Sequence, residues 1–508
     1  MLARVRSACL IGIEAALVSV EVDVTPGLPA FTTVGLPDST VRESRDRVRA
    51  AVKNAGFTFP QERLTVSLAP AELRKEGAAF DLPIALGILA GTGALKRELL
   101  EGCVALGELG LDGEVRAVRG VLPVALTCRR EGPFAVLLPR ANALEAAVVE
   151  GIEVRPVSTL REAVEFLNGE RVLGPVALDT SGLLIHPGGE EGDFSEVRGQ
   201  AHAVRALEVA AAGGHNLLMI GPPGVGKTML ARRLPTILPP LSLNEAIEVS
   251  TIRSVAGLLP PDRRLVSRRP FRAPHHTASE AGLIGGGSVP HPGEVSLAHL
   301  GVLFLDELPE FPQHVLDALR QPLEDGQVVV ARATGAVAFP ARFQLVAAAN
   351  PCRRGCPTLE ACVCTPGERQ RYLARLSRPL LDRIDLHLEL PAVPYAELAQ
   401  RPPGEPSGLI RERVLRARGI QGERFASLAL RLNARMTTRQ VRRFCQIPAE
   451  GQQLLNLAMS RLGLSARGHD RLLKVARTLA DLEGRERIAP EHVAEAIQYR
   501  GLDRALNR

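Results

Sequence analysis

The run GPPGVGKT at 221–228 constrains the fold of this chain more than any other feature. It directly follows an apolar segment, HNLLMI at 215–220, and leads into the helix-forming segment MLARRL. The glycines let consecutive backbone N–H groups point at phosphate oxygens, and the start of a helix favours anions. The sequence therefore predicts a strand, a phosphate-binding loop and a helix in a parallel α/β sheet. A glycine turn without a ligand is the alternative, and the position between strand and helix argues against it.

This loop and a second apolar strand supply the groups that a magnesium-bound nucleotide needs. We expect Lys227 to reach the β- and γ-phosphates and the Thr228 hydroxyl to bind Mg²⁺. The strand GVLFL at 301–305 ends in Asp306 and Glu307, at the edge where α/β sheets bind ligands. Asp306 is predicted to complete the Mg²⁺ coordination and Glu307 to polarise the attacking water, although an acidic pair can also cap a strand. The predicted nucleotide-binding residues are Gly221, Pro222, Pro223, Gly224, Val225, Gly226, Lys227 and Thr228.

Further polar residues follow later apolar segments. FQLVAAAN at 343–350 ends in Asn350, which is placed to orient water against the γ-phosphate. Arg378 and Arg383 flank an apolar segment, and a guanidinium that reaches a neighbour's γ-phosphate stabilises transition-state charge. Arg383 is the better candidate for that role. Arg467 begins a helix near the C-terminus, from which a lid can sense the nucleotide. A surface salt bridge is the alternative for each arginine.

Together these residues resemble the AAA+ ATPases, and more narrowly the YifB/ComM family of the magnesium-chelatase-like branch. The resemblance implies a homo-hexameric ring with ATP and Mg²⁺ bound between subunits, Arg383 acting in trans and Arg467 acting as the sensor of the lid. It covers nearly the whole chain. The strings that carry it are DFSEVRGQ (193–200), RPFRAPHHTAS (269–279), PGEVSLAHLGVLFLDELPEF (292–311), NPC (350–352), LLDRIDLH (380–387) and ARGHDRLLKVARTLADLEG (466–484).

The chain is predicted to be α/β, with four successive parts. Residues 1–168 alternate strand-like and helical runs, and residues 169–192 are a linker rich in glycine, proline and acidic residues. The AAA+ domain with its parallel sheet is expected at 193–395. After a break rich in proline and glycine, residues 396–508 are expected to form a helical lid.

The first domain resembles the proteolytic domain of Lon. The strings that show this are LAPAELRKEGAAFDLPIAL (68–86) and LGELGLDGEVRAVRGVLPVAL (106–126). The nucleophilic serine of that family falls at Ala79, and its lysine partner falls at Leu122. Neither side chain can attack a carbonyl or accept a proton. The resemblance therefore implies a protease fold without protease chemistry, kept for assembly or binding.

Four of the eight cysteines lie close together in the sequence, at Cys352, Cys356, Cys362 and Cys364. Four thiolates at this spacing match a closed, structural Zn²⁺ site, and a metal would supply folding energy to a loop with few core residues. Free thiols are the alternative. In the resembled family the first pair reads C-x-C, whereas here Arg354 takes that place and the thiol follows at Cys356.

Two stretches combine arginines with hairpin signals. RRLVSRRPFRAPHH at 263–276 precedes a glycine-rich tip, and in GQVVVARATGAVAFPARF at 326–343 two strand-like arms flank Thr334 and Gly335. Such basic loops suit contact with a DNA phosphate backbone, and in the resembled branch these hairpins face the pore of the ring. Solvated loops that hold subunits together are the alternative. The candidate DNA-binding residues are Arg269, Arg272, Arg332 and Arg342.

Composition narrows the choice of function. Aromatic residues make up 3% of the chain and tryptophan is absent, so a grip on DNA must come mainly from arginine and lysine. No run approaches the roughly 18 apolar residues of a membrane span, and we expect a cytoplasmic protein. The resemblance implies an ATP-driven DNA motor that performs branch migration in natural transformation. The alternatives are a chelatase-like or chaperone-like remodeller of a protein complex and an ATP-dependent protease, which Ala79 and Leu122 oppose.

Overall fold

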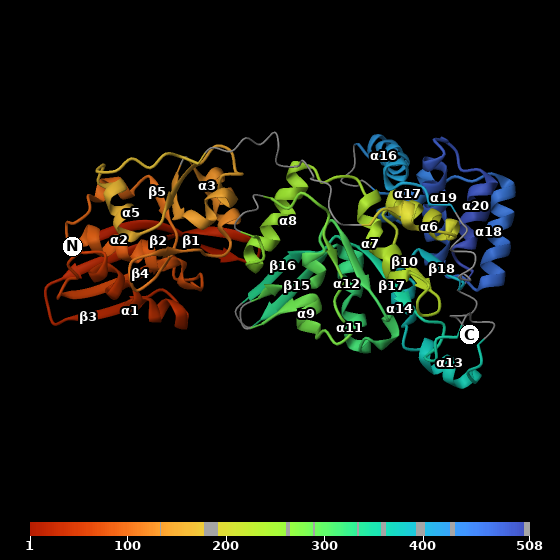
Figure 1. Ribbon diagram of the computed structural model, residues 1–508, viewed down its shortest axis with the longest axis horizontal. Coiled ribbons are helices and arrows are strands. Elements are labelled where there is room, and N and C mark those ends of the chain that lie inside the picture. The colour runs from red at the N-terminus through yellow and green to blue at the C-terminus, as the bar shows by residue number, and fades with distance from the viewer. Residues whose placement is uncertain are drawn as a thin grey trace. The chain divides into compact units, whose positions relative to one another are not determined.

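The computed structural model describes residues 1–132, 134–176, 192–260, 265–287, 290–332, 335–356, 362–392, 402–426 and 432–501. Helices and strands form two compact units that are not contiguous in sequence (Figure 1). Unit 1 comprises Met1–Ile185, Ser242–Ser267 and Ala331–Ala338. Unit 2 comprises His186–Leu241, Arg268–Val330 and Phe339–Arg508. Two segments from the middle of the chain thus group with the N-terminal residues.

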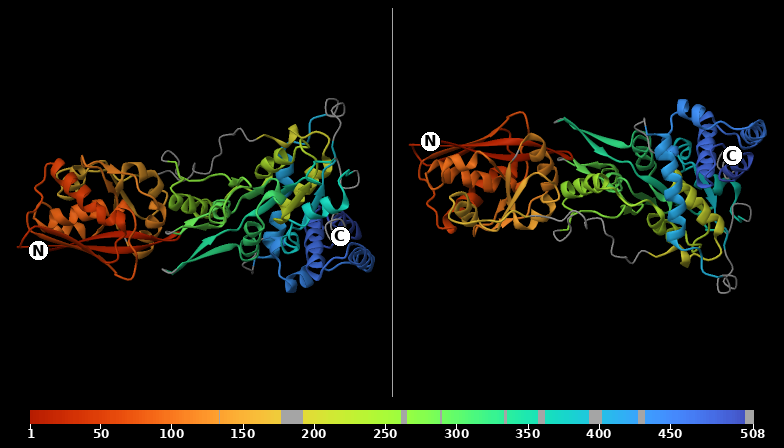
Figure 2. Two further views of the ribbon diagram at one scale, coloured as in Figure 1. Left: turned by 90° about the horizontal axis from the view of Figure 1, so that it is seen from below. Right: turned by 90° about the horizontal axis from the view of Figure 1, so that it is seen from above.

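Unit 1 is built on a seven-stranded mixed sheet of order β3-β4-β2-β1-β5-β8-β9. Figure 2 shows the long β1 and β2 strands, in red, along one side of the unit and helices on the other. The strands are β1 (Leu2–Ile11), β2 (Glu14–Thr25), β3 (Ala30–Val34), β4 (Arg63–Ala69), β5 (Cys103–Ala105), β8 (Ala135–Pro139) and β9 (Glu153–Val157), beside a small pair, β6 (Glu108–Leu109) and β7 (Val115–Arg116). The helices are α1 (Ser39–Asn54), α2 (Asp81–Gly91), α3 (Val121–Glu131), α4 (Ala143–Ala146), α5 (Leu160–Leu167) and α8 (Leu243–Ala256).

The alternation of residues in β1 explains which face of this sheet carries the core. Ala3 and Val5 are buried, whereas Arg4 and Arg6 between and beyond them are exposed. The fully buried helix α2 covers the apolar face, and a Cβ atom at Gly87 would lie 2.5 Å from Val22 Cγ2. Only glycine therefore allows this close approach of helix and strand.

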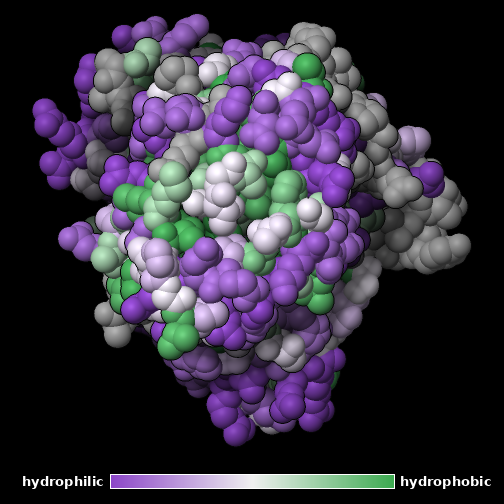
Figure 3. Space-filling model, turned by 90° about the vertical axis from the view of Figure 1, so that its left-hand side faces the viewer, coloured by the Kyte–Doolittle hydropathy of each residue, from purple (hydrophilic) through white to green (hydrophobic). Residues whose placement is uncertain are grey.

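One face of unit 1 carries a gathered set of apolar side chains. Figure 3 shows them around a shallow hollow, surrounded by hydrophilic side chains. Strongly exposed apolar side chains of this unit include Leu28 and Leu36, which flank the outer strand β3. Single exposed apolar residues are common, whereas a gathered set is unusual on a monomeric domain.

The two residues that replace the Lon dyad lie in regular structure in this unit. Ala79 belongs to the short 3₁₀ turn Ala78–Phe80, where its carbonyl accepts the Gly107 N–H at 3.0 Å. Leu122 lies in the first turn of α3 and is fully buried. Both positions thus hold apolar packing residues, and the Lon-like interpretation itself stays a prediction.

Unit 2 contains the parallel sheet that the sequence predicted. Its order is β11-β14-β17-β10-β18, and all four neighbouring pairs are parallel. Every residue of β10, β14 and β17 is buried, as expected for strands covered on both faces. The strands of this sheet are β10 (Leu217–Ile220), β11 (Phe271–Arg272), β14 (Val302–Leu305), β17 (Gln344–Ala349) and β18 (Leu386–Glu389), and a small sheet pairs β12 (Gly285–Gly286) with β13 (His291–Pro292). A further pair, β15 (Gln327–Arg332) with β16 (Gly335–Pro340), includes the segment Ala331–Ala338 that is grouped with unit 1.

The C-terminal region is helical, as predicted, and shares one hydrophobic core with the helices beside the sheet. The first set of helices is α6 (Ala201–Gly213), α7 (Lys227–Ile237), α9 (Glu280–Ile284), α10 (Glu294–Leu297), α11 (Gln313–Ala318), α12 (Arg320–Asp325), α13 (Pro366–Leu373) and α14 (Arg378–Leu381). The C-terminal set is α16 (Ser407–Arg424), α17 (Thr438–Phe444), α18 (Ala449–Leu462), α19 (Ala466–Leu482) and α20 (Pro490–Gln498). None of the described helices is long and apolar enough to cross a bilayer.

A buried polar network ties helix α19 to the base of this sheet. Asp385, which precedes β18, accepts hydrogen bonds from His215 Nδ1 at 3.0 Å and from Arg471 of α19 at 2.5 Å. The other ring nitrogen of His215 lies 2.8 Å from the Thr478 hydroxyl, also on α19. Burial raises the pKa of Asp385, but the charge of Arg471 and the hydrogen bond from His215 outweigh it, so the pKa falls below its usual value.

We expect Asp385→Asn to lower the free energy of unfolding by about 3 kcal/mol, because it leaves Arg471 without its buried partner. The carboxylate stabilises the fold at neutral pH, and this contribution is lost only as the pH falls through the depressed pKa. Urea unfolding of the variant beside Asp325→Asn, at an exposed position of α12, measures the difference. Equal stabilities of the two variants would contradict the role given to the network.

Candidate functional site

The phosphate loop connects the buried strand β10 to helix α7. Gly224 and Gly226 have φ angles of +79° and +91°, which side chains with a Cβ atom rarely adopt. A Cβ atom at Gly221 would lie 2.6 Å from the Leu390 carbonyl oxygen. Gln200 closes the loop from the other side, because its Nε2 donates to the Val225 carbonyl at 2.7 Å. The glycines are thus required by the backbone path of the loop.

Lys227 is folded back onto the loop that precedes it. Its Nζ donates to the carbonyl oxygens of Gly221 at 2.6 Å and Pro222 at 2.9 Å, and to Asn350 Oδ1 at 3.0 Å. Burial lowers the pKa of Lys227, and the charges of Asp306 and Glu307 oppose this change. Three acceptor oxygens thus hold the ammonium group of Lys227 between the phosphate loop and Asn350.

Thr228, in the first turn of α7, and Asp306, which directly follows β14, meet at one edge of the sheet. The Thr228 hydroxyl donates to Asp306 Oδ2 at 2.7 Å, and Asp306 Oδ1 accepts the Glu307 N–H at 2.9 Å. A hydroxyl oxygen beside a carboxylate oxygen is a donor set that Mg²⁺ accepts together with phosphate oxygens and water. The predicted magnesium ligands are therefore side by side, 78 residues apart in the sequence.

Glu307 sits in a constrained backbone position and has a partner that the sequence analysis did not identify. Its φ angle is +51°, in the left-handed region that few non-glycine residues adopt. Its Oε2 lies 3.3 Å from His276 Nδ1, and the His276 ring lies against Phe311 and His275. From the sequence, His276 is predicted only as part of a basic stretch that contacts DNA. The adjacent pair His275 and His276, which follows the short strand β11, is the sequence feature that could have indicated a role near the acidic pair.

The three arginines considered for a role at the nucleotide each lie in or beside a helix, and neither Arg383 nor Arg467 has a hydrogen bond or ion pair with the phosphate loop among the described residues. Arg383 is largely buried, its Nη2 lies 2.5 Å from Glu324, and it also donates to the Pro379 carbonyl. Arg467 is exposed in the first turn of α19, and its side chain has no hydrogen-bond or ion-pair partner among the described residues. Arg378 begins α14. Their roles toward a nucleotide stay predictions, and for Arg383 such a role requires release from Glu324.

The structure separates the four arginines predicted to bind DNA into two groups. Arg269 donates to the carbonyl oxygens of Pro239 and Leu300, and Arg272 makes a two-point ion pair with Glu294 at 2.6 and 2.7 Å. Both guanidinium groups are thus bound to partners within unit 2, which indicates a role in stabilising the fold. Arg342 is exposed, and Arg332 ends β15, where its side chain lies outside the described residues, as does Thr334 at the hairpin tip.

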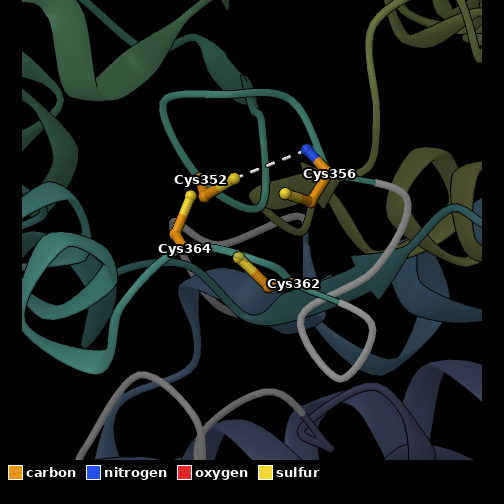
Figure 4. A group of neighbouring side chains, drawn as sticks. All are labelled: Cys352, Cys356, Cys362 and Cys364. Atoms are coloured by element: carbon orange, nitrogen blue, oxygen red, sulfur yellow. Dashed lines mark hydrogen bonds between the residues drawn. The ribbon is translucent and has the colours of Figure 1, made fainter.

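The four clustered cysteines converge despite the departure in spacing. Their Sγ atoms all lie within 4.8 Å of one another, and the Cys356 N–H donates to Cys352 Sγ at 3.4 Å (Figure 4). Burial raises the pKa of the Cys352 thiol, but the hydrogen bonds from Cys356 outweigh it, and the pKa falls to about 7. Zn–S bonds of about 2.3 Å place the sulfurs of a tetrahedral site about 3.8 Å apart. The cluster fits such a metal after a small contraction.

Comparison with known proteins identifies the family. A family described as magnesium chelatase, subunit ChlI, matches residues 193–398. Families described as subunit ChlI of Mg-chelatase and as its C-terminal region match residues 20–142 and 404–500. The competence protein ComM of Haemophilus influenzae is 46% identical over 512 residues, which cover 100% of this chain and 99% of that protein. The chain belongs to the YifB/ComM family of magnesium-chelatase-like AAA+ proteins.

Two further relatives, one similar over the full length and one over a part of the chain, show how far the similarity extends. The YifB protein of Salmonella typhimurium is 44% identical over 507 residues, 99% of this chain and 98% of that protein. The magnesium-chelatase 38 kDa subunit of Rhodobacter capsulatus is 28% identical over 176 residues, 31% of this chain and 50% of that protein. Membership confirms the resemblance drawn from the motifs. A magnesium-chelatase-like AAA+ protein implies ATPase activity with ATP and Mg²⁺.

We expect Lys227→Ala to weaken ATP binding about tenfold or more, because a charge-assisted hydrogen bond contributes about 1.5–3 kcal/mol. Titration calorimetry with a non-hydrolysable ATP analogue measures the affinity. Arg232→Ala, at an exposed position of the same helix, is the matched control and should bind as the wild type does. Equal affinity of both variants would remove Lys227 from the site.

Proposed function

We propose that this chain is an ATP-driven, homo-hexameric motor that moves DNA strands and performs branch migration while incoming DNA is integrated. The convergence of Lys227, Thr228, Asp306 and Asn350 at one sheet edge supports the ATP-driven part. The name of the ComM relative, a competence protein, supports a task in DNA uptake. The arginine-bearing hairpin of β15 and β16 supports contact with a polyanion.

The chemistry follows from the positions of the side chains. Lys227 exchanges its carbonyl partners for the β- and γ-phosphates, and its positive charge stabilises the charge that develops on them. Thr228 and Asp306 would hold Mg²⁺, and the ion would supply positive charge that neutralises the phosphate oxygens. Glu307 accepts a hydrogen bond from the attacking water and orients it, which requires that its carboxylate leave His276. Asn350 orients the same water from the neighbouring strand.

In a ring, two arginines would complete this site: Arg383 from the adjacent subunit and Arg467 from the C-terminal helices. Arg383 is proposed to reach the γ-phosphate of the adjacent subunit after leaving Glu324, and Arg467 to contact the nucleotide from the lid. In enzymes that use an arginine in this position, the guanidinium increases the rate of hydrolysis by a factor of about 10³–10⁵. Because Arg383 is held by Glu324 in this structure, assembly of the ring would change its partner.

DNA contact is proposed for Arg332 and Arg342 alone. Arg342 is exposed, and Arg332 lies at the end of β15 beside the hairpin tip. Arg269 and Arg272 are not included, because backbone carbonyls and Glu294 already hold their guanidinium groups. The contact is with phosphates and carries affinity without sequence preference.

A second candidate function is remodelling of a protein complex. The similarity to the magnesium-chelatase 38 kDa subunit favours it, because that relative shares the same branch of ATPases. The two candidates differ in the polymer that stimulates ATP hydrolysis. For a protein remodeller we expect the rate of ATP hydrolysis to be the same with and without DNA.

The test is ATP turnover with and without single-stranded and branched DNA, in the wild type and in Arg332→Ala. We expect DNA to stimulate turnover of the wild type and to lose most of this effect in the variant, because a phosphate contact is removed. Arg416→Ala, at an exposed position of α16, is the matched control and should keep the stimulation. Turnover that does not respond to DNA in any of these proteins would favour the remodeller.

We propose that the cysteine cluster holds one structural Zn²⁺ ion. Elemental analysis of the purified protein is expected to find about one zinc per chain, since four thiolates complete a tetrahedral site. Cys352→Ser should lose the metal and lower the thermal midpoint, because the loop folds around the ion. Cys128→Ala, at a buried position in unit 1, should keep the zinc. A zinc-free wild type with four titratable thiols would contradict the site.

A further inference from the structure

A cavity of about 350 Å³ lies beside the cysteine cluster in unit 2. Two of the cysteines line it together with six other residues, and we refer to it as the arginine cavity. Those residues are Arg353, Arg354, Glu368, Arg371, Tyr372 and Arg375. Four arginines thus line one small space, at a place that neither the ATP site nor the hairpin of β15 and β16 includes.

The arginines of this cavity are incompletely paired. Arg354 lies 3.6 Å from Glu368, and Arg375 lies 3.1 Å from Glu310, outside the lining. Arg371 donates its Nε to the Gly367 carbonyl of its own helix at 3.2 Å. Arg353 has no hydrogen-bond or ion-pair partner among the described residues. Arg371 also interacts electrostatically with Glu368, so Arg353 alone has no carboxylate partner among the described residues, and all four arginines are exposed to solvent.

The chemistry of the cavity selects a phosphate ligand over a nucleotide base. Guanidinium groups bind phosphate oxygens in a planar, two-point geometry, and several of them recognise a phosphodiester without reading its sequence. Tyr372 is the one aromatic side chain of the lining, and only 6% of it is exposed, so it offers no open surface on which a base could stack.

The walls of the cavity touch three parts of the ATP site. A Cβ atom at Gly355 would lie 2.9 Å from Pro223 of the phosphate loop, so the segment after Arg354 packs directly on that loop. Tyr372 is hydrogen-bonded to the backbone of Asn350. Arg375 donates to the Pro309 carbonyl at 3.3 Å, in the turn that follows Glu307. A ligand that moves these walls therefore acts on the groups around the nucleotide.

We propose that the arginine cavity binds a phosphate group of the DNA backbone and links this binding to ATP hydrolysis through Gly355, Tyr372 and Arg375. The proposal rests on the proposed DNA function and adds a contact site to it. Free inorganic phosphate shares the chemistry. The competing explanation is that the arginines neutralise the negative charge of the cysteine cluster, since four thiolates around Zn²⁺ leave a net charge of about −2.

The experiment uses the full-length double variant Arg353→Glu, Arg371→Glu. Fluorescence anisotropy with a labelled oligothymidylate measures affinity across a range of salt concentrations. We expect the variant to bind at least tenfold more weakly, and the slope of log K against log[salt] to become shallower by about 1, since each single-strand phosphate contact contributes about 0.7. Its ATP turnover should also respond less to DNA. Arg411→Glu, Arg416→Glu on α16 reverses two other exposed arginines and should leave the affinity, slope and stimulation unchanged.

The outcomes separate this proposal from the proposed function. A wild type that binds DNA, with a double variant that binds equally well, would overturn the arginine cavity and leave the motor standing. Loss of zinc from the double variant with unchanged DNA affinity would assign the arginines to charge balance. A wild type that binds inorganic phosphate here but no oligonucleotide would contradict both. If the charge reversal prevents folding, Arg353→Gln, Arg371→Gln should show the same loss of affinity with a smaller magnitude.

Discussion

The hydrogen bond between the Thr228 hydroxyl and Asp306 is the contact on which the nucleotide site depends. It exists because β17 lies between β10 and β14, so that three parallel strands end at one edge of the sheet. The phosphate loop, the acidic pair and Asn350 then arrive at the same place from distant parts of the chain. These strands are buried along their whole length, as is usual for parallel strands that are covered on both faces, and this burial fixes their register.

The surroundings of the site show how its groups are held before a nucleotide binds. Lys227 rests on three oxygen atoms, Glu307 contacts His276, and Arg383 contacts Glu324. In the proposed mechanism, each of these side chains leaves its local partner before it acts on ATP. Binding of the nucleotide would therefore replace existing hydrogen bonds of these side chains with new ones. The charged groups would then have partners both with and without the nucleotide.

Helix α19 connects the helical C-terminal region to the same sheet. Its residues Arg471 and Thr478 join the buried network around Asp385 and His215, which lie at the starts of β18 and β10. The phosphate loop follows the other end of β10. A change in the position of these C-terminal helices can thus act on the strand that carries the loop, because the two share one hydrophobic core.

The sequence could predict the parts of the site that depend on local chemistry. GPPGVGKT needs its glycines for positive φ angles, and apolar runs ending in Asp306 or Asn350 indicate strands of a parallel sheet. Long-range pairing could not be predicted, because nothing adjacent in the sequence marks Glu324 as the partner of Arg383 or His276 as that of Glu307. The same holds for α8, which packs on α3 in unit 1 although it lies between parts of the nucleotide domain.

The most direct test of the account is a single-turnover ATPase measurement on Glu307→Gln, combined with ATP binding by the same protein. We predict an affinity close to that of the wild type and hydrolysis slower by about a hundredfold or more, because a residue that activates the attacking water contributes about 10²–10⁴ in rate. Hydrolysis at the wild-type rate in this variant, or a wild-type protein that binds no ATP, would contradict the assignment of this sheet edge as the catalytic site.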